Sequence, residues 1–144
     1  MTQLRSKYYR VSVKALVLNE ARDKFLIMRQ ENDIWDLPGG GLEWGEKVHS
    51  GLAREIMEEM GVETTYIAEH PSYFLGGFKM SKESDLWVVN IVYETELTHL
   101  NFTHSNECLE VRFVSLCDLK TLEKVPPTVR ELAEKFKPEN CIRK

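Results

Sequence analysis

The chain has 144 residues, of which 42% are hydrophobic and 29% are charged, and its formal net charge is −4. This length and composition are typical of a single soluble globular domain, and no segment supplies the roughly 20 apolar residues that a membrane-spanning helix needs. The negative net charge offers no broad cationic surface to a nucleic-acid backbone, so we expect neither a membrane nor a nucleic-acid polymer as a partner.

We expect one domain over residues 1–144, located in the cytoplasm, because the basic N-terminus is not followed by the apolar stretch of a signal peptide. The three cysteines lack C-x-x-C spacing, which argues against a disulfide framework and against a zinc site. We therefore predict free thiols at Cys108, Cys117 and Cys141. Monomer and homodimer are both compatible with the sequence.

The N-terminal third of the chain predicts two strands and a loop. Residues 8–19 and 24–29 are rich in apolar side chains without a helix breaker, which predicts two strands that form a hairpin. Residues 32–45 contain one proline and four glycines, which make a regular element unlikely. Because long glycine-rich loops inside compact domains tend to be functional, we expect this loop to contribute to a site.

A helix is predicted next, over residues 46–60. The acidic side chain of Glu46 would lie in its first turn, where the helix dipole favours negative charge, and Gly61 stands at the usual C-terminal position. Its apolar stripe consists of Val48, Leu52, Ile56 and Met60.

The rest of the chain predicts further strands at residues 63–68, 73–78, 86–97 and 110–114. After Pro126 and Pro127, apolar side chains at i, i+3, i+4 and i+7 predict a second helix over about residues 128–136. The fold predicted from these elements is a mixed α/β domain, with a single mixed sheet flanked by two or more helices.

Charged side chains crowd the middle helix, where Arg54, Glu55, Glu58 and Glu59 fall within six positions. A glutamate cluster usually forms a solvated helix face, but Glu59 lies about 20° from Leu52 on the helical wheel, inside the apolar stripe. A buried carboxylate next to two others is unfavourable unless a cation compensates the charge. The cluster therefore predicts a site for a hard divalent ion such as magnesium.

The preceding loop contains the run Trp35-Asp36-Leu37-Pro38-Gly39-Gly40-Gly41, in which bare backbone groups can approach a ligand closely. Five residues separate Gly40 from Glu46, and seven more precede the run Arg54-Glu55-Ile56-Met57-Glu58-Glu59-Met60-Gly61-Val62. This spacing resembles a complete Nudix box over residues 40–62. A chance match to so many fixed positions is far rarer than a match to a short glycine motif.

The resemblance implies both a fold and an activity. Nudix proteins are single domains in which a central mixed sheet lies between helices, an α/β/α sandwich that carries the box as loop, helix and loop. The implied reaction is hydrolysis of a phosphoanhydride bond in a small-molecule substrate, a nucleoside diphosphate linked to another group. Magnesium is the implied cofactor, with manganese as a substitute.

The resemblance also implies roles for individual residues. Glu55, Glu58 and Glu59 would bind the metal, and a backbone carbonyl near Gly39 or Gly40 would complete the set of ligands.

Arg54 and Glu46 would form a supporting pair, in which Arg54 holds Glu55 or Glu58 in its productive rotamer. Glu58 is the first candidate for the general base. A glutamate from a late loop is the alternative, and Glu107 and Glu110 stand in the corresponding region, so the assignment stays open.

The substrate is less well determined. Arg29, just after the second predicted strand, is a candidate phosphate contact, although a basic residue at a strand end is as often a surface residue. Residues 77–80 lack the tyrosine or proline that marks relatives acting on ADP-ribose or dinucleoside polyphosphates, which favours a MutT-like nucleoside triphosphate pyrophosphohydrolase, with oxidised nucleotides among the candidates. Hydrolysis of ADP-ribose, nucleotide sugars or dinucleoside polyphosphates remains an alternative, as do a non-catalytic nucleotide sensor and an acidic interaction domain.

Overall fold

A computed structural model describes residues 8–80, 83 and 85–137, so the thiol predicted at Cys141 lies outside the described residues. Its strands are β1 (Tyr9–Leu16), β2 (Phe25–Arg29), β3 (Trp35–Asp36), β4 (Gly39–Gly41), β5 (Thr64–Ile67), β6 (Tyr73–Lys79), β7 (Trp87–Leu97) and β8 (Glu110–Val114). Its helices are α1 (Val48–Met60), α2 (Pro127–Lys135) and a short 3-10 helix (Cys117–Thr121). Both α-helices were predicted from the sequence.

The strands form two sheets rather than the single sheet that we predicted. The larger sheet has the order β4-β1-β7-β5, with β6 also paired to β7. It is mixed, because β1 and β7 are parallel while the other pairs are antiparallel. The smaller, antiparallel sheet has the order β3-β2-β8.

The predicted hairpin of residues 8–19 and 24–29 forms only next to its turn, where the amide of Leu26 donates to the carbonyl of Val17 over 2.8 Å, and it does not extend along β1. Both edges of β1 are occupied, one by β4 and the other by β7, so β2 pairs with β3 and β8 instead. Leu18 and Phe25 form an isolated antiparallel bridge in this short paired stretch. Of the partners of β2, β3 is the next strand in the chain, whereas β8 is the last.

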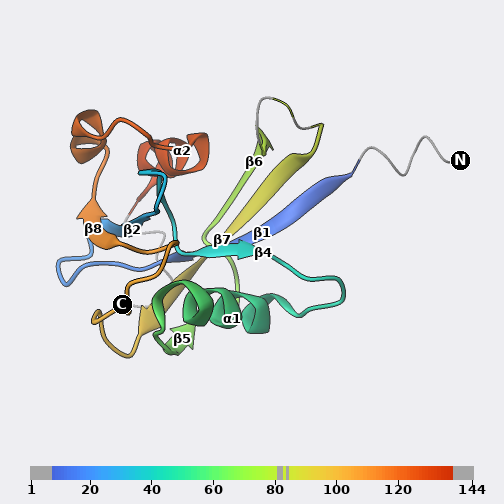
Figure 1. The fold of residues 1–144 in the computed structure, drawn as a ribbon, viewed down its shortest axis with the longest axis horizontal. Coiled ribbons are helices and arrows are strands. Elements are labelled where there is room, and N and C mark those ends of the chain that lie inside the picture. The colour runs from blue at the N-terminus through green and yellow to red at the C-terminus, as the bar shows by residue number, and fades with distance from the viewer. Residues whose placement is uncertain (1–7, 81–82, 84, 138–144) are drawn as a thin grey trace, which may run out of the picture.

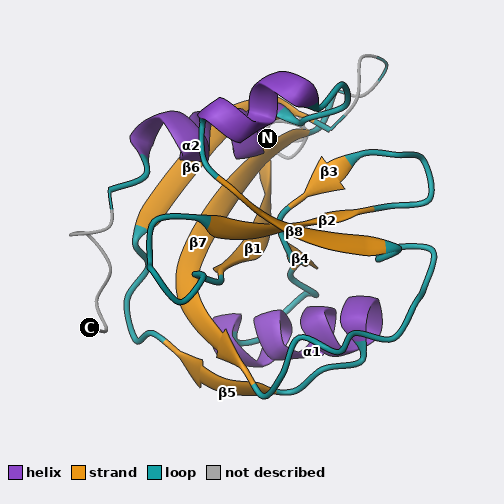
Figure 2. Ribbon diagram, turned by 90° about the vertical axis from the view of Figure 1, so that its left-hand side faces the viewer, coloured by secondary structure: helices purple, strands orange, loops and turns teal. Residues whose placement is uncertain are grey.

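The helices cover opposite sides of the strands (Figure 1, Figure 2). Side chains alternate along each strand, so Val13 and Ala15 pack in a core with α1, whereas Leu16 packs in a second core with α2. Residues of β2 divide between the two cores in the same way. The architecture is therefore the expected sandwich of helix, sheet and helix.

The segment between β2 and α1 is more regular than its glycines suggested, because β3 and β4 lie within it. Glycines 39–41 are extended and pair antiparallel with residues 12–14 of β1. The helix begins at Val48 after Lys47, so Glu46 precedes it and the predicted acid in the first turn is wrong. Gly61 ends the helix in the left-handed conformation with φ 67°, as predicted.

Two further sequence expectations concern cysteines and membranes. Cys108, which is buried, and Cys117, which is exposed, are both free thiols. Among the residues with described structure, no helix combines the length and the apolar character needed to cross a membrane.

Candidate active site

Glu59 is a carboxylate within the core that α1 shares with the sheet. It is 3% exposed, as its place in the apolar stripe predicted, and the amide of Gly39 donates a hydrogen bond of 2.8 Å to its Oε1. Burial raises the pKa of Glu59 to about 9, against the opposing effects of the Lys14 ammonium and the Gly39 amide. A cation at this position would compensate the buried charge.

Glu55 lies one helical turn earlier and covers the glycine strand. A Cβ atom on Gly40 would lie 2.6 Å from the Glu55 carboxylate, so any larger residue here would displace the end of the Glu55 side chain. Burial raises the pKa of Glu55, and the neighbouring Arg54 guanidinium opposes this effect. Two carboxylates of α1 therefore face the backbone of β4.

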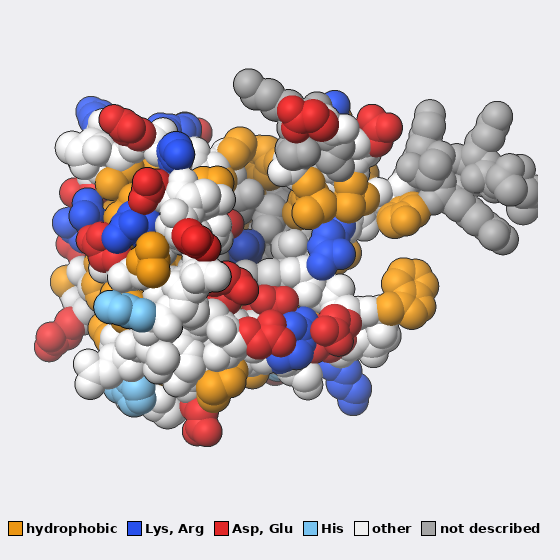
Figure 3. Space-filling model, in the orientation of Figure 1, with side chains coloured by type: hydrophobic (Ala, Val, Ile, Leu, Met, Phe, Trp, Pro, Cys, Tyr) orange, Lys and Arg blue, Asp and Glu red, His pale blue; other side chains and the backbone are white. Residues whose placement is uncertain are grey.

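Arg54 connects the loop and the helix. Its Nε and Nη2 atoms donate to the two carboxylate oxygens of Glu46 over 2.7 and 2.9 Å, while Nη1 donates to Glu55 over 3.1 Å and to Glu58 over 3.2 Å. The hydrogen bonds from Arg54 lower the pKa of Glu46 to about 2, and they raise the pKa of Arg54. The structure thus brings together the supporting pair expected from the sequence, and Figure 3 shows acidic and basic side chains adjoining over α1 and β4.

The two late acids are placed differently. The hydroxyl of Ser105 donates a hydrogen bond of 2.7 Å to the backbone carbonyl of Glu59 and accepts one from the amide of Glu107. These bonds connect the loop that contains Glu107 to the end of α1. Burial is the main cause of the raised pKa values of Glu55 and Glu59, and the negative charge of Glu107 adds to it in both cases.

The carboxylate of Glu110 instead accepts hydrogen bonds from Arg29 Nε over 3.2 Å and from Arg112 Nη2 over 3.1 Å. Arg29 also donates to Asp33 over 3.0 Å, so the candidate phosphate contact is held by two carboxylates at the end of β2. The geometry favours Glu107 over Glu110 as the acid that can reach the cluster.

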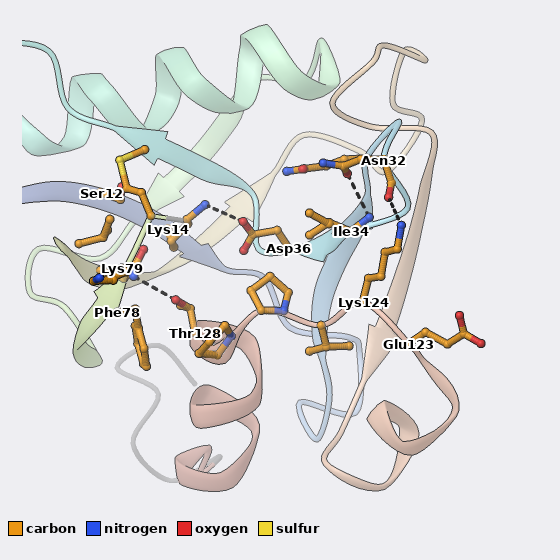
Figure 4. Close-up of a pocket in the computed structure, with 17 residues that line it drawn as sticks. Ser12, Lys14, Asn32, Ile34, Asp36, Phe78, Lys79, Glu123, Lys124 and Thr128 are labelled. Carbon is orange, nitrogen blue, oxygen red and sulfur yellow. Dashed lines mark hydrogen bonds and ion pairs between the residues drawn. The ribbon is translucent and has the colours of Figure 1, made fainter. Parts of the chain in front are cut away.

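A cavity of about 640 Å³ adjoins this region, between the larger sheet and the segment that leads into α2 (Figure 4). Lys14 and Asp36 line this cavity side by side. The ammonium of Lys14 also donates to the backbone carbonyl of Gly39 over 3.3 Å. A second hollow of about 450 Å³ reaches Glu107 and shares Gln30 and Asn32 with the first. The two hollows therefore adjoin each other at Gln30 and Asn32.

The residues present fit a divalent metal ion. In residues 8–80, 83 and 85–137, no three acidic, histidine or cysteine side chains are already gathered around a common point, and Arg54 bridges Glu55 and Glu58 instead. Carboxylate and carbonyl oxygens are the ligands that magnesium prefers. Glu55, Glu58, Glu59 and the carbonyl of a glycine in β4 are donors of this chemical type.

The register of β4 distinguishes the two candidate carbonyls. The hydrogen bonds from Ala15 to Pro38 and from Leu42 to Val11 flank the pair Val13–Gly40, so alternation directs the backbone groups of Gly40 toward β1. Those of Gly39 face the free edge, where its amide meets Glu59. The carbonyl of Gly39 is therefore the better placed of the two.

Sequence reasoning missed Lys14 and Ser105. Lys14 could have been found, because it is a lone charged side chain in the apolar run Val11-Ser12-Val13-Lys14-Ala15-Leu16. Ser105 carries no such signal, since its role depends on a contact with a helix that ends 45 residues earlier.

Comparison with known proteins places these features in a family. The family model described as NUDIX domain matches residues 8–136. The crystal structure of MutT protein from Methanosarcina mazei Go1 superposes with a TM-score of 0.74 and is 31% identical, over 93% of this chain and 96% of that one.

Two curated relatives match over shorter segments. A putative 8-oxo-dGTP diphosphatase of Bacillus subtilis is 44% identical over 46 residues, 32% of this chain and 31% of the relative. An RNA pyrophosphohydrolase of Campylobacter jejuni is 40% identical over 73 residues, 46% of this chain and 47% of the relative. The matched segments thus span less than half the length of these two relatives.

Proposed function

The chain belongs to the Nudix family, and on this premise we propose that it is a magnesium-dependent hydrolase that cleaves a phosphoanhydride bond in a nucleoside diphosphate linked to another group. The observation that carries this proposal is Glu59, a carboxylate 3% exposed and hydrogen-bonded to the glycine strand. Such a charge is costly to bury without a cation. A solvated acidic surface for a protein partner would not place a glutamate there.

The donor set consists of Glu55, Glu58, Glu59 and the carbonyl of Gly39. These residues would hold magnesium, or manganese in its place, and a metal ion bound there would supply charge neutralisation for phosphate oxygens and a more acidic water. Arg54 aligns Glu55 and Glu58 through the hydrogen bonds described above. Glu58, whose side chain is 54% exposed, is the first candidate for the base that accepts the proton of the attacking water, and Glu107 is the second.

The cavity supports a nucleoside at one end of the substrate. Its lining combines apolar side chains, among them Phe78, Met80 and Val125, with charged side chains and with the buried polar side chains of Ser12, Asn90 and Thr128. The apolar side chains can pack against the faces of a heterocycle, and the polar ones can bind its edge.

We infer that the substrate is a nucleoside triphosphate, cleaved to the monophosphate and pyrophosphate. The relative named putative 8-oxo-dGTP diphosphatase supports a substrate of this kind, and oxidised deoxynucleotides belong in any test. The negative net charge of −4 favours free nucleotides over a polymer.

The test is product analysis over a panel of ordinary and oxidised nucleoside triphosphates, ADP-ribose, dinucleoside polyphosphates and nucleotide sugars, each with magnesium, manganese or EDTA. We expect metal-dependent release of a nucleoside monophosphate from the triphosphates. Binding of a triphosphate without cleavage would support a nucleotide sensor instead, and cleavage of another class alone would reassign the substrate.

A further inference from the structure

Lys14 is a buried cation on the cavity side of the sheet. Residues 12, 14 and 16 of β1 point to the same face, where Leu16 packs into the core with α2, so an apolar side chain would be ordinary at position 14. Lys14 is instead charged and 9% exposed. Lysine is rarely buried to this degree without a strong partner.

The partners that Lys14 has are weak. Its Nζ atom lies 3.4 Å from Asp36 Oδ2, 3.5 Å from the carbonyl of Leu37 and 3.3 Å from the carbonyl of Gly39. All three distances exceed the usual range of about 2.7 to 3.2 Å for such hydrogen bonds. Asp36 is shared as well, because its other oxygen accepts the amide of Leu37. The ammonium can therefore make a stronger hydrogen bond to a further acceptor.

The position of Lys14 indicates which acceptor this is. Lys14 lines the cavity and contacts the carbonyl of Gly39, whose amide holds Glu59 (Figure 4). It thus lies where the cavity meets the acid cluster. A substrate with its base in the cavity and its cleaved bond at the cluster must pass this side chain, and a phosphate oxygen is the anionic acceptor that it brings there.

The other cavity lysines are already engaged outside this junction. Lys124 donates to the carbonyl of Asn32 over 3.1 Å, and its hydrogen bond lies on the exposed rim. Lys79 lies over the ring of Trp87, 5.9 Å from its centroid. Neither of them contacts the glycine strand in the described structure.

We propose that Lys14 binds the phosphate attached to the nucleoside, and so sets the position of the substrate between the cavity and the acid cluster. This inference rests on the proposed function, since it assumes a nucleotide in the cavity. It assigns a substrate contact that neither the sequence motif nor the acid cluster contains.

The test compares binding of a nucleoside monophosphate and of its nucleoside, AMP with adenosine and GMP with guanosine, by calorimetry in EDTA. The ratio of the two affinities isolates the phosphate contact and needs neither metal nor catalysis. We expect the wild-type protein to prefer one monophosphate over its nucleoside at least tenfold. Lys14→Met should abolish this preference while nucleoside binding is retained, and Lys14→Arg should keep most of it.

Two further variants separate the contact from a general effect. Lys14→Met with Asp36→Asn removes both charges of the buried pair, which guards against misfolding of the single variant, and it should lose the preference in the same way. Lys120→Met removes an exposed lysine of the 3-10 helix and should leave the ratio unchanged.

The outcomes distinguish this inference from the proposed function. A wild-type protein that binds neither monophosphate, or shows no preference for it, overturns the role of Lys14, as does a preference that survives Lys14→Met. Hydrolysis in the panel would still stand in those cases. Conversely, a preference that depends on Lys14 in a protein that cleaves nothing supports the phosphate contact and rejects the hydrolase.

Discussion

Single side chains in this site are held in states that they would not adopt in water. Glu59 is the extreme case, since burial raises its pKa from 4.5 to about 9. Glu46 is the opposite case, since Arg54 lowers its pKa to about 2. Glu46 is thus stabilised in its charged form by Arg54, whereas burial disfavours the charged form of Glu59.

This contrast predicts how stability depends on pH when metal is absent. The folded state binds the Glu59 proton more tightly than the unfolded state does, so its contribution to stability is full below the unfolded pKa of 4.5 and is lost as pH rises toward the folded value of about 9. In EDTA, the free energy of unfolding should fall over this interval, as measured by urea denaturation. Glu59→Gln should flatten the dependence, and magnesium should restore stability at the alkaline end.

The exposed Glu134→Gln is the matched control and should keep the wild-type pH dependence. If Glu59→Gln does so as well, the carboxylate is not the buried group that the structure places in the core.

Arg54 offers a second prediction at the residue scale. Lysine keeps the charge but cannot bind both oxygens of Glu46 and also reach Glu55. Arg54→Lys should therefore raise the magnesium concentration for half-maximal activity by about 10- to 100-fold, which is typical when a residue that orients metal ligands is lost. The measurement is a magnesium titration of turnover, with the melting temperature as a check on folding. An unchanged magnesium requirement would contradict the positioning role.

Among the elements, β4 and α1 together form the site. The helix was predictable because its apolar stripe has a period of 3.6 residues and Gly61 marks its end. The stripe also indicated that Glu59 is buried. The strand was not predictable, because three glycines have no intrinsic preference for an extended chain and Gly39–Gly41 is extended only through its pairing with β1.

The close contact of these two elements can be tested at Gly40. Gly40→Ala should push the Glu55 carboxylate out of place, since the new Cβ would lie 2.6 Å from it, and should lower turnover about tenfold or more. Gly76→Ala is the matched control on another strand, because its Cβ would meet Val89 at an ordinary 3.4 Å. Equal activity of the two variants would show that Glu55 does not depend on this contact.

In the whole molecule, strands of both sheets contribute side chains to two separate cores, one with α1 and one with α2. The apolar segments predicted most of the strands, yet they could not show which strands pair. One of the two partners of β2 is β8, with Phe25 opposite Val114, and no local pattern records a contact over that separation. The same limit hid Lys14, whose neighbours Asp36 and Gly39 belong to other strands.

For the whole molecule, we propose an enzyme that uses the glutamates of α1 to hydrolyse a phosphoanhydride bond. The turnover of the Glu58→Gln variant tests this proposal most directly. The side chain is 54% exposed, so the substitution should leave the fold intact while it removes a ligand or base. With saturating magnesium and the best substrate of the panel, we predict a loss of about 100-fold or more, against wild-type turnover for Glu134→Gln. Near wild-type turnover of Glu58→Gln would contradict the assignment.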